Sequence, residues 1–282
     1  MKNENSIGSC LKESSHTSIR TAIPAKNEAL VIDSHGSSIY GRLLLPAHQQ
    51  PEDTSPVVVL LHGYPGTEQN IDVAQSIRAC GMASVHFCYR GVWGSHGVYS
   101  FSHIIEDTIE VVSFIRSHAE EFHLDPSRIY LLGHSMGGFA AVNAIAQGLQ
   151  VRGAILMAPC DMANKCLYDP PAFDSLLSHQ QKGYFITRSS ESLREDAMEH
   201  AAQWLFTTAA AKLDPGIQYG FIGGAEDKQT PPEIHILPLL RALKERNIDA
   251  PYAEICDSHT FPGTRKELTD LILSYLSSME SV

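Results

Sequence analysis

Short runs of apolar residues recur along the chain and alternate with longer amphipathic stretches. The apolar runs predict eight β-strands, because they are short, rich in Val, Ile and Leu, and bounded by polar or glycine-containing turns. They cover Leu30–Asp33, Ile39–Leu45, Val57–Leu61, Ala83–Tyr89, Ile129–Leu132, Ala154–Met157, Tyr219–Ile222 and Tyr252–Cys256. The middle runs are mostly apolar, as expected of strands that are covered on both faces of a sheet.

Helical periodicity fills several of the gaps between these runs. Apolar residues between Ile105 and Ile115 are spaced by three or four positions, which places them on one helical face. Ser135–Ala146 is helical in composition, and a further apolar stripe runs from Leu268 to Tyr275. Alternating strands and helices favour parallel pairing with right-handed crossovers, so the pattern predicts an α/β sandwich.

One stretch breaks this alternation, because Cys160 to Gly216 is far longer than a crossover helix requires. It contains a predicted helix over Ala172–Lys182 and a capping-box pattern at Ser192–Glu195, which would open a long Ala-rich helix toward Lys212. Two interpretations remain open. Residues 161–215 form a small helical cap over a site, or they form one extended crossover helix with a surface excursion.

Composition narrows the class of protein and its partners. The chain has 282 residues, of which 43% are hydrophobic and 19% are charged, and this excludes a disordered tail, a collagen-like repeat and a coiled coil. The net charge of −11 would repel a phosphate backbone, so we expect neither nucleic acid nor an anionic membrane surface as a partner. The apolar runs are too short to span a bilayer. The sequence does not predict an oligomeric state.

The N-terminal segment is polar and mixed in charge, and it lacks the apolar core of a secretory signal. We therefore expect a flexible arm over 1–28, one domain over 29–282, and a cytoplasmic location. Six irregularly spaced cysteines are typical of a reducing compartment, and no zinc-binding spacing occurs, so we expect no metal and no cofactor.

Gly133-His-Ser-Met-Gly137 is the strongest chemical signal in the sequence. It follows one predicted strand and precedes a predicted helix, which is the context in which G-x-S-x-G forms a sharp turn that exposes its serine. Ser135 is therefore the candidate nucleophile. A serine hydroxyl needs a base to remove its proton, and His259 follows the last predicted strand, where its loop returns to the carboxyl edge of the sheet.

The acid that would orient His259 has more than one candidate. Asp227 follows the strand Tyr219–Ile222, and its loop has a short reach to His259, so it is our prediction. Glu226 is adjacent to it, and Asp161 occupies the other loop from which such folds can supply an acid.

Charge that develops on a tetrahedral intermediate needs fixed donors. We predict that they are the backbone N–H of Met136 and that of Tyr64, in the glycine-containing loop after Val57–Leu61. His62, in the same loop, is expected to be a structural hydrogen bonder. Trp93, Tyr168 and Trp204 are candidates for an apolar substrate pocket, although Trp204 could equally bury one face of its own helix.

These segments together resemble the α/β-hydrolase superfamily over about residues 28–280. The elbow Gly133–Gly138, the Asp227 loop and His259 carry the resemblance, and so does His62-Gly63. Tyr89–Gly97 is similar to the Y-R-G-x-G-x-S segment of serine aminopeptidases, monoacylglycerol lipase-like hydrolases and prolyl oligopeptidase catalytic domains, with one extra residue before its second glycine. The resemblance implies a mostly parallel eight-stranded sheet flanked by helices, and we expect a hydrolase core without a propeller.

Three functions compete at this point. The leading one is a serine esterase that cleaves a small-molecule carboxylic ester through an acyl-enzyme on Ser135. A peptidase, an amidase or an acyltransferase could use the same Ser135, His259 and Asp227. A non-catalytic binding protein of the same fold is the third, and the intact set of candidate residues argues against it.

Overall fold

The computed structural model describes residues 23–48, 50, 52–178 and 185–281. Most of the predicted arm therefore lies outside the described residues. The first strand begins at Lys26, inside the stretch that the sequence had assigned to the arm.

All eight predicted strands are present and form one sheet in the order β1-β2-β4-β3-β5-β6-β7-β8. β2 runs antiparallel to both of its neighbours, β1 and β4, and all other pairings are parallel. The sheet is therefore mostly parallel, as predicted. The strands are β1 (Lys26–Ser34), β2 (Ser37–Leu45), β3 (Ser55–Leu61), β4 (Ala83–Phe87), β5 (Leu124–His134), β6 (Gly153–Met157), β7 (Gln218–Gly224) and β8 (Tyr252–Ile255).

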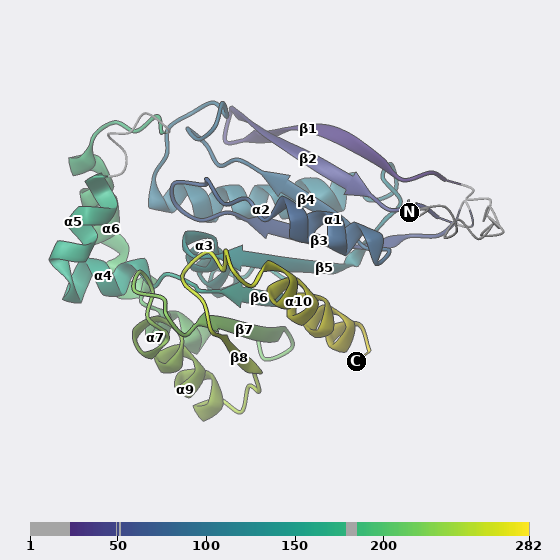
Figure 1. The fold of residues 1–282 in the computed structure, drawn as a ribbon. Helices are drawn as coiled ribbons and strands as arrows, with labels where there is room; N and C mark the ends of the chain where they lie inside the picture. Colours follow the sequence, from purple (N-terminus) through teal and green to yellow (C-terminus); the bar gives the residue numbers. More distant parts are fainter. Residues whose placement is uncertain (1–22, 49, 51, 179–184, 282) are drawn as a thin grey trace, which may run out of the picture.

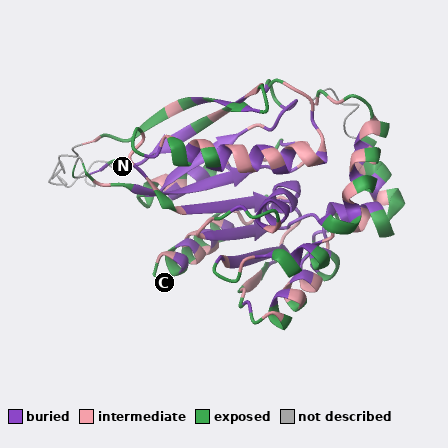
Figure 2. Ribbon diagram, turned by 180° about the vertical axis from the view of Figure 1, so that it is seen from behind, coloured by how far each residue is buried: buried purple, intermediate pink, exposed green. Residues whose placement is uncertain are grey.

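Helices cover both faces of the sheet (Figure 1). One face packs against α1 (Ile71–Ala79) and α10 (Arg265–Glu280), and the other against α2 (Phe101–Ser117), α3 (Met136–Ala146) and α9 (Leu237–Glu245). Side chains of β3 alternate between two hydrophobic clusters, since Val57 and Val59 join one and Val58 joins the other. This double burial explains why the central strands read as unbroken apolar runs, and Figure 2 shows them buried along their length.

The long stretch after β6 contains α4 (Met162–Tyr168), α5 (Pro170–Ser178) and α6 (Ser190–Trp204), which lie beyond the carboxyl ends of the strands (Figure 1). The sequence did not predict α4. The end of the predicted helix Ala172–Lys182 lies outside the described residues.

The predicted start and end of the Ala-rich helix were wrong. The capping box forms between Ser189 and Ser192, so α6 begins before the predicted Ser192–Glu195 box. The helix ends at Trp204, because the next residue, Leu205, has an extended ψ of 128°. The chain continues as α7 (Phe206–Ala209) and a 3₁₀ turn, η2 (Ala210–Lys212). The break has a tertiary cause, because the Phe206 N–H donates to Asp161 Oδ2 at 3.0 Å.

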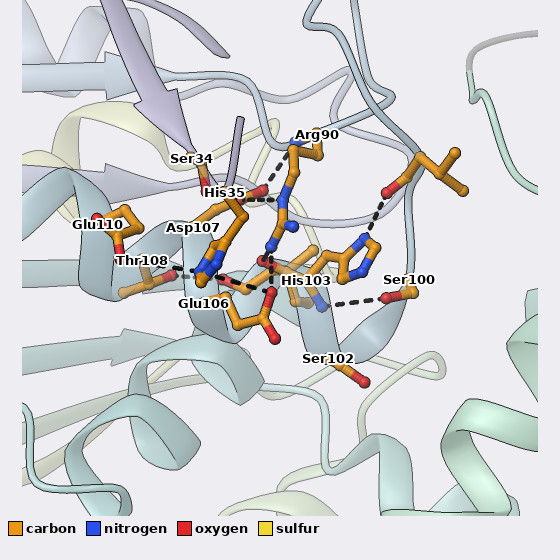
Figure 3. Close-up of polar contacts among 12 residues, drawn as sticks. Ser34, His35, Arg90, Ser100, Ser102, His103, Glu106, Asp107, Thr108 and Glu110 are labelled. Atoms are coloured by element: carbon orange, nitrogen blue, oxygen red, sulfur yellow. Dashed lines mark hydrogen bonds and ion pairs between the residues drawn. The ribbon is translucent and has the colours of Figure 1, made fainter. Parts of the chain in front are cut away.

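A buried ion pair fastens the loop after β4 to α2 and β1 (Figure 3). Asp107 Oδ1 accepts from Arg90 Nε and from Ser34 Oγ, each at 2.6 Å, and Asp107 Oδ2 accepts from the Arg90 backbone N–H at 2.8 Å. Burial raises the pKa of the Asp107 carboxyl, while the charge of Arg90 opposes that rise. Both charges are therefore held in place by each other and by hydrogen bonds.

None of the helices in the described ranges combines the length and the apolar character needed to cross a membrane.

The Arg90–Asp107 pair generates a stability prediction. Arg90→Met leaves Asp107 as a buried carboxylate without its cation, so the free energy of unfolding should fall by about 3–5 kcal/mol. The matched control is Lys266→Met, which breaks an exposed pair with Asp270 and should cost less than about 1 kcal/mol. Denaturant unfolding of both variants measures the difference, and equal losses would contradict the prediction.

Candidate active site

Ser135 lies in the sharp turn between β5 and α3, as the sequence predicted. Its φ of 54° and ψ of −116° are a conformation that a residue with a side chain seldom adopts. Neighbouring backbone holds it there. The Ser135 N–H donates to the Met157 carbonyl at 3.0 Å, and the Ser135 carbonyl accepts from the N–H groups of Gly138 and Cys160, each at 2.9 Å.

The glycines on either side of Ser135 are required by backbone contacts. A Cβ on Gly133 would lie 2.6 Å from the Gly137 carbonyl oxygen. One on Gly137 would overlap the Leu61 carbonyl oxygen of β3. Because only glycine lets backbone approach backbone this closely, the pattern G-x-S-x-G follows from the packing of α3 on the sheet.

His259 follows β8 and lies between Ser135 and Asp227. Its Nε2 is 2.8 Å from Ser135 Oγ, and its Nδ1 is 2.7 Å from Asp227 Oδ2. A carboxylate can only accept, so Nδ1 carries the proton of the neutral ring and Nε2 accepts from the serine hydroxyl. The three residues that the sequence proposed for catalysis are thus brought together in one hydrogen-bonded chain.

Asp227 is buried and accepts hydrogen bonds on both oxygens. Oδ1 accepts from the N–H groups of Gln229 at 2.8 Å and Thr230 at 3.0 Å, and Oδ2 accepts from Thr230 Oγ1 at 2.7 Å. Burial alone would raise the pKa of the Asp227 carboxyl, but His259 and Thr230 outweigh it and hold that pKa well below its usual range. Asp227 therefore remains ionised beside the imidazole at neutral pH.

Asp161, the alternative acid, has a different role in the fold. Its Oδ1 caps α4 by accepting from the Asn164 N–H at 3.0 Å, and its Oδ2 accepts from the Phe206 N–H. Burial raises the pKa of Asp161 to about 6. These contacts shape the helices after β6, whereas Asp227 makes the contact with the imidazole of His259.

Two further residues, which the sequence did not indicate, contact His259. Thr230 Oγ1 lies 3.1 Å from His259 Nδ1, and His134 Nε2 donates to the His259 backbone carbonyl at 2.9 Å. Burial lowers the pKa of His134 to about 3, so its ring is neutral at physiological pH. His134 stood inside the elbow motif, but only the folded arrangement places it against the loop after β8.

The loop after β3 lies directly beside the nucleophile. A Cβ on Gly63 would come within 3.0 Å of the Ser135 Cβ, so this backbone passes close to where a substrate must bind. His62 Nδ1 donates to the Gly63 carbonyl at 2.7 Å, and burial lowers the pKa of His62 to about 4. These contacts suit the structural role expected of His62.

The two predicted oxyanion donors lie in the first turn of α3 and in the loop after β3. Met136 is the first residue of α3, and the N–H groups of a first helical turn have no intrahelical acceptor. Tyr64 follows Gly63, and its ring stacks on Phe185 with centroids 4.4 Å apart. Their role as donors to an oxyanion remains a prediction at this point.

Two cavities meet at Ser135 and His259. One of about 330 Å³ is bounded by the loop after β3, including Gly63 and Glu68. The other, of about 220 Å³, extends toward α4 and α5 and is bounded by Cys160 and Lys165, among others. The larger cavity has mainly polar walls, whereas the walls of the smaller cavity are mainly apolar.

The three aromatic residues predicted for the pocket do not line either cavity in the described part of the chain. Trp204 is buried against Phe139 of α3, so it belongs to the core, the alternative that the sequence had left open. Tyr168 is 69% exposed on α4. Trp93 donates from Nε1 to the Pro65 carbonyl at 3.0 Å and so supports the loop that contains Tyr64.

No group of three or more His, Cys, Asp or Glu side chains within the described ranges is arranged to hold a metal ion.

Comparison with known proteins identifies the family. The family model described as serine aminopeptidase, S33, matches residues 52–200, which is more than half of the chain. The chain belongs to this family. The S33 match includes Ser135 and ends before Asp227 and His259, so the other two members of the hydrogen-bonded chain are located by the structure rather than by the match.

Sequence relatives of this S33 chain are distant. Proteins named uncharacterized protein YfhR, from Salmonella typhimurium strain LT2 and from Salmonella typhi, are each 26% identical to it over 124 residues. The matched stretch covers 43% of this chain and 41% of each relative, so it spans less than half of their length.

Solved structures resemble the S33 chain over most of its length. Esterase Est22 matches with a TM-score of 0.67 at 16% identity, covering 92% of this chain and 80% of the esterase. A puromycin hydrolase matches with a TM-score of 0.67 at 18% identity, covering 92% of this chain and 40% of the puromycin hydrolase. A protein described as a putative hydrolase from Agrobacterium vitis S4 matches with a TM-score of 0.60 at 21% identity, covering 90% of this chain and 99% of that protein. Their shared architecture, together with the S33 match, shows that this chain has the α/β-hydrolase fold.

The contact between α3 and β3 gives a second stability prediction. Gly137→Ala should lower the free energy of unfolding by about 3 kcal/mol or more, because its Cβ would meet the Leu61 carbonyl and neither backbone can move aside.

The matched control is Gly148→Ala. Gly148 has a φ of 101° but open space around it, so alanine should cost only about 1–2 kcal/mol of backbone strain. Thermal and denaturant unfolding measure both variants. A Gly137→Ala protein that is as stable as Gly148→Ala would show that the elbow tolerates a wider separation of α3 from β3.

Proposed function

We propose that this protein hydrolyses small-molecule carboxylic esters through an acyl-enzyme on Ser135. The observation that carries the proposal is the hydrogen-bonded chain from Ser135 through His259 to Asp227, with donor and acceptor distances of 2.8 and 2.7 Å. Such a chain activates an otherwise inert hydroxyl, because the imidazole takes the proton as the oxygen attacks.

In the first half of the proposed reaction, Ser135 Oγ attacks the ester carbonyl carbon while its proton passes to His259 Nε2. The carbonyl oxygen becomes an oxyanion that the N–H groups of Tyr64 and Met136 would stabilise. When the tetrahedral intermediate collapses, the carbon–oxygen bond to the alcohol breaks, and the departing oxygen takes the proton from His259. Asp227 favours the imidazolium formed in between, since it is ionised and hydrogen-bonded to Nδ1.

In the second half, a water molecule gives a proton to His259 while its oxygen attacks the acyl carbon. Ser135 then leaves with the returned proton, and the carboxylic acid is released. Every proton in this cycle passes through His259 Nε2. This nitrogen must therefore be able to accept a proton, which a hydrogen bond from another donor would hinder. The arrangement needs no oxidant or reductant.

One comparison supports an ester over an amide substrate. Est22 is called an esterase and is matched over 80% of its length, whereas the match to the puromycin hydrolase covers 40% of that chain. Peptidase activity is the second candidate, and the family description supports it. The two differ in the leaving group alone, so one pair of substrates separates them.

Replacement of the nucleophile tests the proposal. Wild-type protein should hydrolyse 4-nitrophenyl butyrate, and Ser135→Ala should lower kcat/KM by about 10⁴-fold or more while the thermal unfolding temperature stays close to that of wild type. The matched anilide with the same acyl group, 4-nitrobutyranilide, should be a poorer substrate than the ester. A faster anilide reaction would favour the peptidase, and full ester turnover by folded Ser135→Ala would exclude an acyl-enzyme on this residue.

The acid is tested by two isosteric substitutions. Asp227→Asn should lower kcat by about 10³- to 10⁴-fold, because an amide cannot hold the imidazole in the required tautomer or stabilise its charge. Asp161→Asn is the control, and we expect its kcat to stay within about tenfold of wild type because Asp161 contacts only backbone amides. Loss of activity in folded Asp161→Asn with a near-normal Asp227→Asn would reverse the assignment.

A further inference from the structure

Two lysines line the smaller cavity beside Ser135. Lys165 lies on α4, and Lys228 directly follows Asp227 in the loop after β7. The other walls come from uncharged residues such as Cys160 and Leu176, and no carboxylate lines this cavity in the described part of the chain. The cavity therefore has a positive wall within reach of the reacting centre, in a chain whose net charge is −11.

Neither lysine is neutralised by an acidic side chain. Within the described ranges no Asp or Glu oxygen lies within 4.0 Å of Lys165 Nζ or Lys228 Nζ, although Lys26, Lys266 and several arginines have such partners. Lys165 Nζ instead donates to the Gln229 backbone carbonyl at 2.7 Å. This bond leaves two of its three donors for a ligand.

The position of Lys165 is fixed by the fold. Asp161 caps the helix that carries it, and the half-buried Lys165 side chain is tethered to the loop that also supplies Asp227. A tethered ammonium loses less freedom on binding than one on a free surface chain, so it is a better anchor for an anion.

The larger cavity has no such positively charged wall in the described part of the chain. Its one charged lining residue is Glu68, whose Oε1 accepts from the Asn70 N–H at 2.7 Å and lies 3.9 Å from Arg265 Nη2. A substrate with one neutral end and one negative end would therefore bind in one direction, with its negative end toward α4.

We propose that the substrate is an ester with a free carboxylate, which Lys165 and Lys228 bind in the smaller cavity while the ester carbonyl lies at Ser135. This inference rests on the proposed function and specifies its substrate class. The lysines select the substrate by charge and hold it in register, and they take no part in moving protons. The carboxylate belongs to whichever half of the ester, acyl or alcohol, enters this cavity.

Two pairs of esters test the inference. In the acyl pair, 4-nitrophenyl hydrogen adipate carries the carboxylate and 4-nitrophenyl hexanoate is its neutral partner. In the alcohol pair, 3-carboxyphenyl butyrate is compared with 3-carbamoylphenyl butyrate. Rates are corrected for spontaneous hydrolysis. We expect kcat/KM to favour the anionic ester by about tenfold or more in one pair, and the preference to shrink as salt is added.

Substitutions then assign the preference to these lysines. Lys165→Met and Lys228→Met should each lower the ratio of anionic to neutral kcat/KM by about fivefold, and Lys165→Arg should retain most of it. Lys244→Met is the matched control, because Lys244 is exposed on α9 and lines neither cavity at Ser135, and its ratio should equal that of wild type. Thermal unfolding checks that all variants are folded.

The outcomes separate this inference from the proposed function. Turnover of the neutral esters with no preference for the anionic partner in either pair would overturn the inference and leave the esterase proposal intact. A preference that survives in the Lys165→Met, Lys228→Met double variant would also overturn it. No turnover of any ester, with no labelling of Ser135 by a fluorophosphonate, would remove both.

Discussion

Ser135 is held at a positive φ by the hydrogen bond that its N–H donates to Met157 at the end of β6, by the one that its carbonyl accepts from Cys160, and by the close packing of α3 on β3. The rest of the site depends on this arrangement. The Ser135 Oγ can lie 2.8 Å from His259 Nε2 only if α3 sits at backbone distance from the sheet. Reacting groups lose rate steeply when displaced by an ångström, so the tight core beneath the elbow has a direct chemical consequence.

The loop that carries Tyr64 is supported by residues that are distant in sequence. Trp93 holds the Pro65 carbonyl, and Phe185 stacks on the Tyr64 ring. Ile186 in turn exchanges backbone hydrogen bonds of 2.7 Å with the segment after β4, through its N–H and its carbonyl. Residues from the long stretch between β6 and β7 thus contact the proposed oxyanion donor as well as the smaller cavity, so they could influence both rate and substrate choice.

Three buried carboxylates show how the same group takes different roles according to its partners. Asp107 is paired with Arg90 and anchors a loop, and burial is the larger influence on its pKa. Asp161 binds backbone amides and has a raised pKa of about 6. Asp227 meets an imidazole and a hydroxyl, so its pKa is lowered instead. Lys165 and Lys228 complete this pattern, since both line the smaller cavity and neither has an acidic partner within 4.0 Å in the described part of the chain.

The sequence by itself determined the strands, the elbow with Ser135, and His259 as the base after the last strand. Short stretches of sequence specify these features, because strands buried on both faces require apolar runs and the tight turn requires glycines around Ser135. The tertiary structure decided between Asp227 and Asp161, placed Thr230 and His134 against His259, and ended α6 at Trp204. It also moved Trp204 from the expected pocket into the core and left two lysines there instead. These outcomes depend on contacts between segments far apart in the chain, which no local pattern of residues encodes.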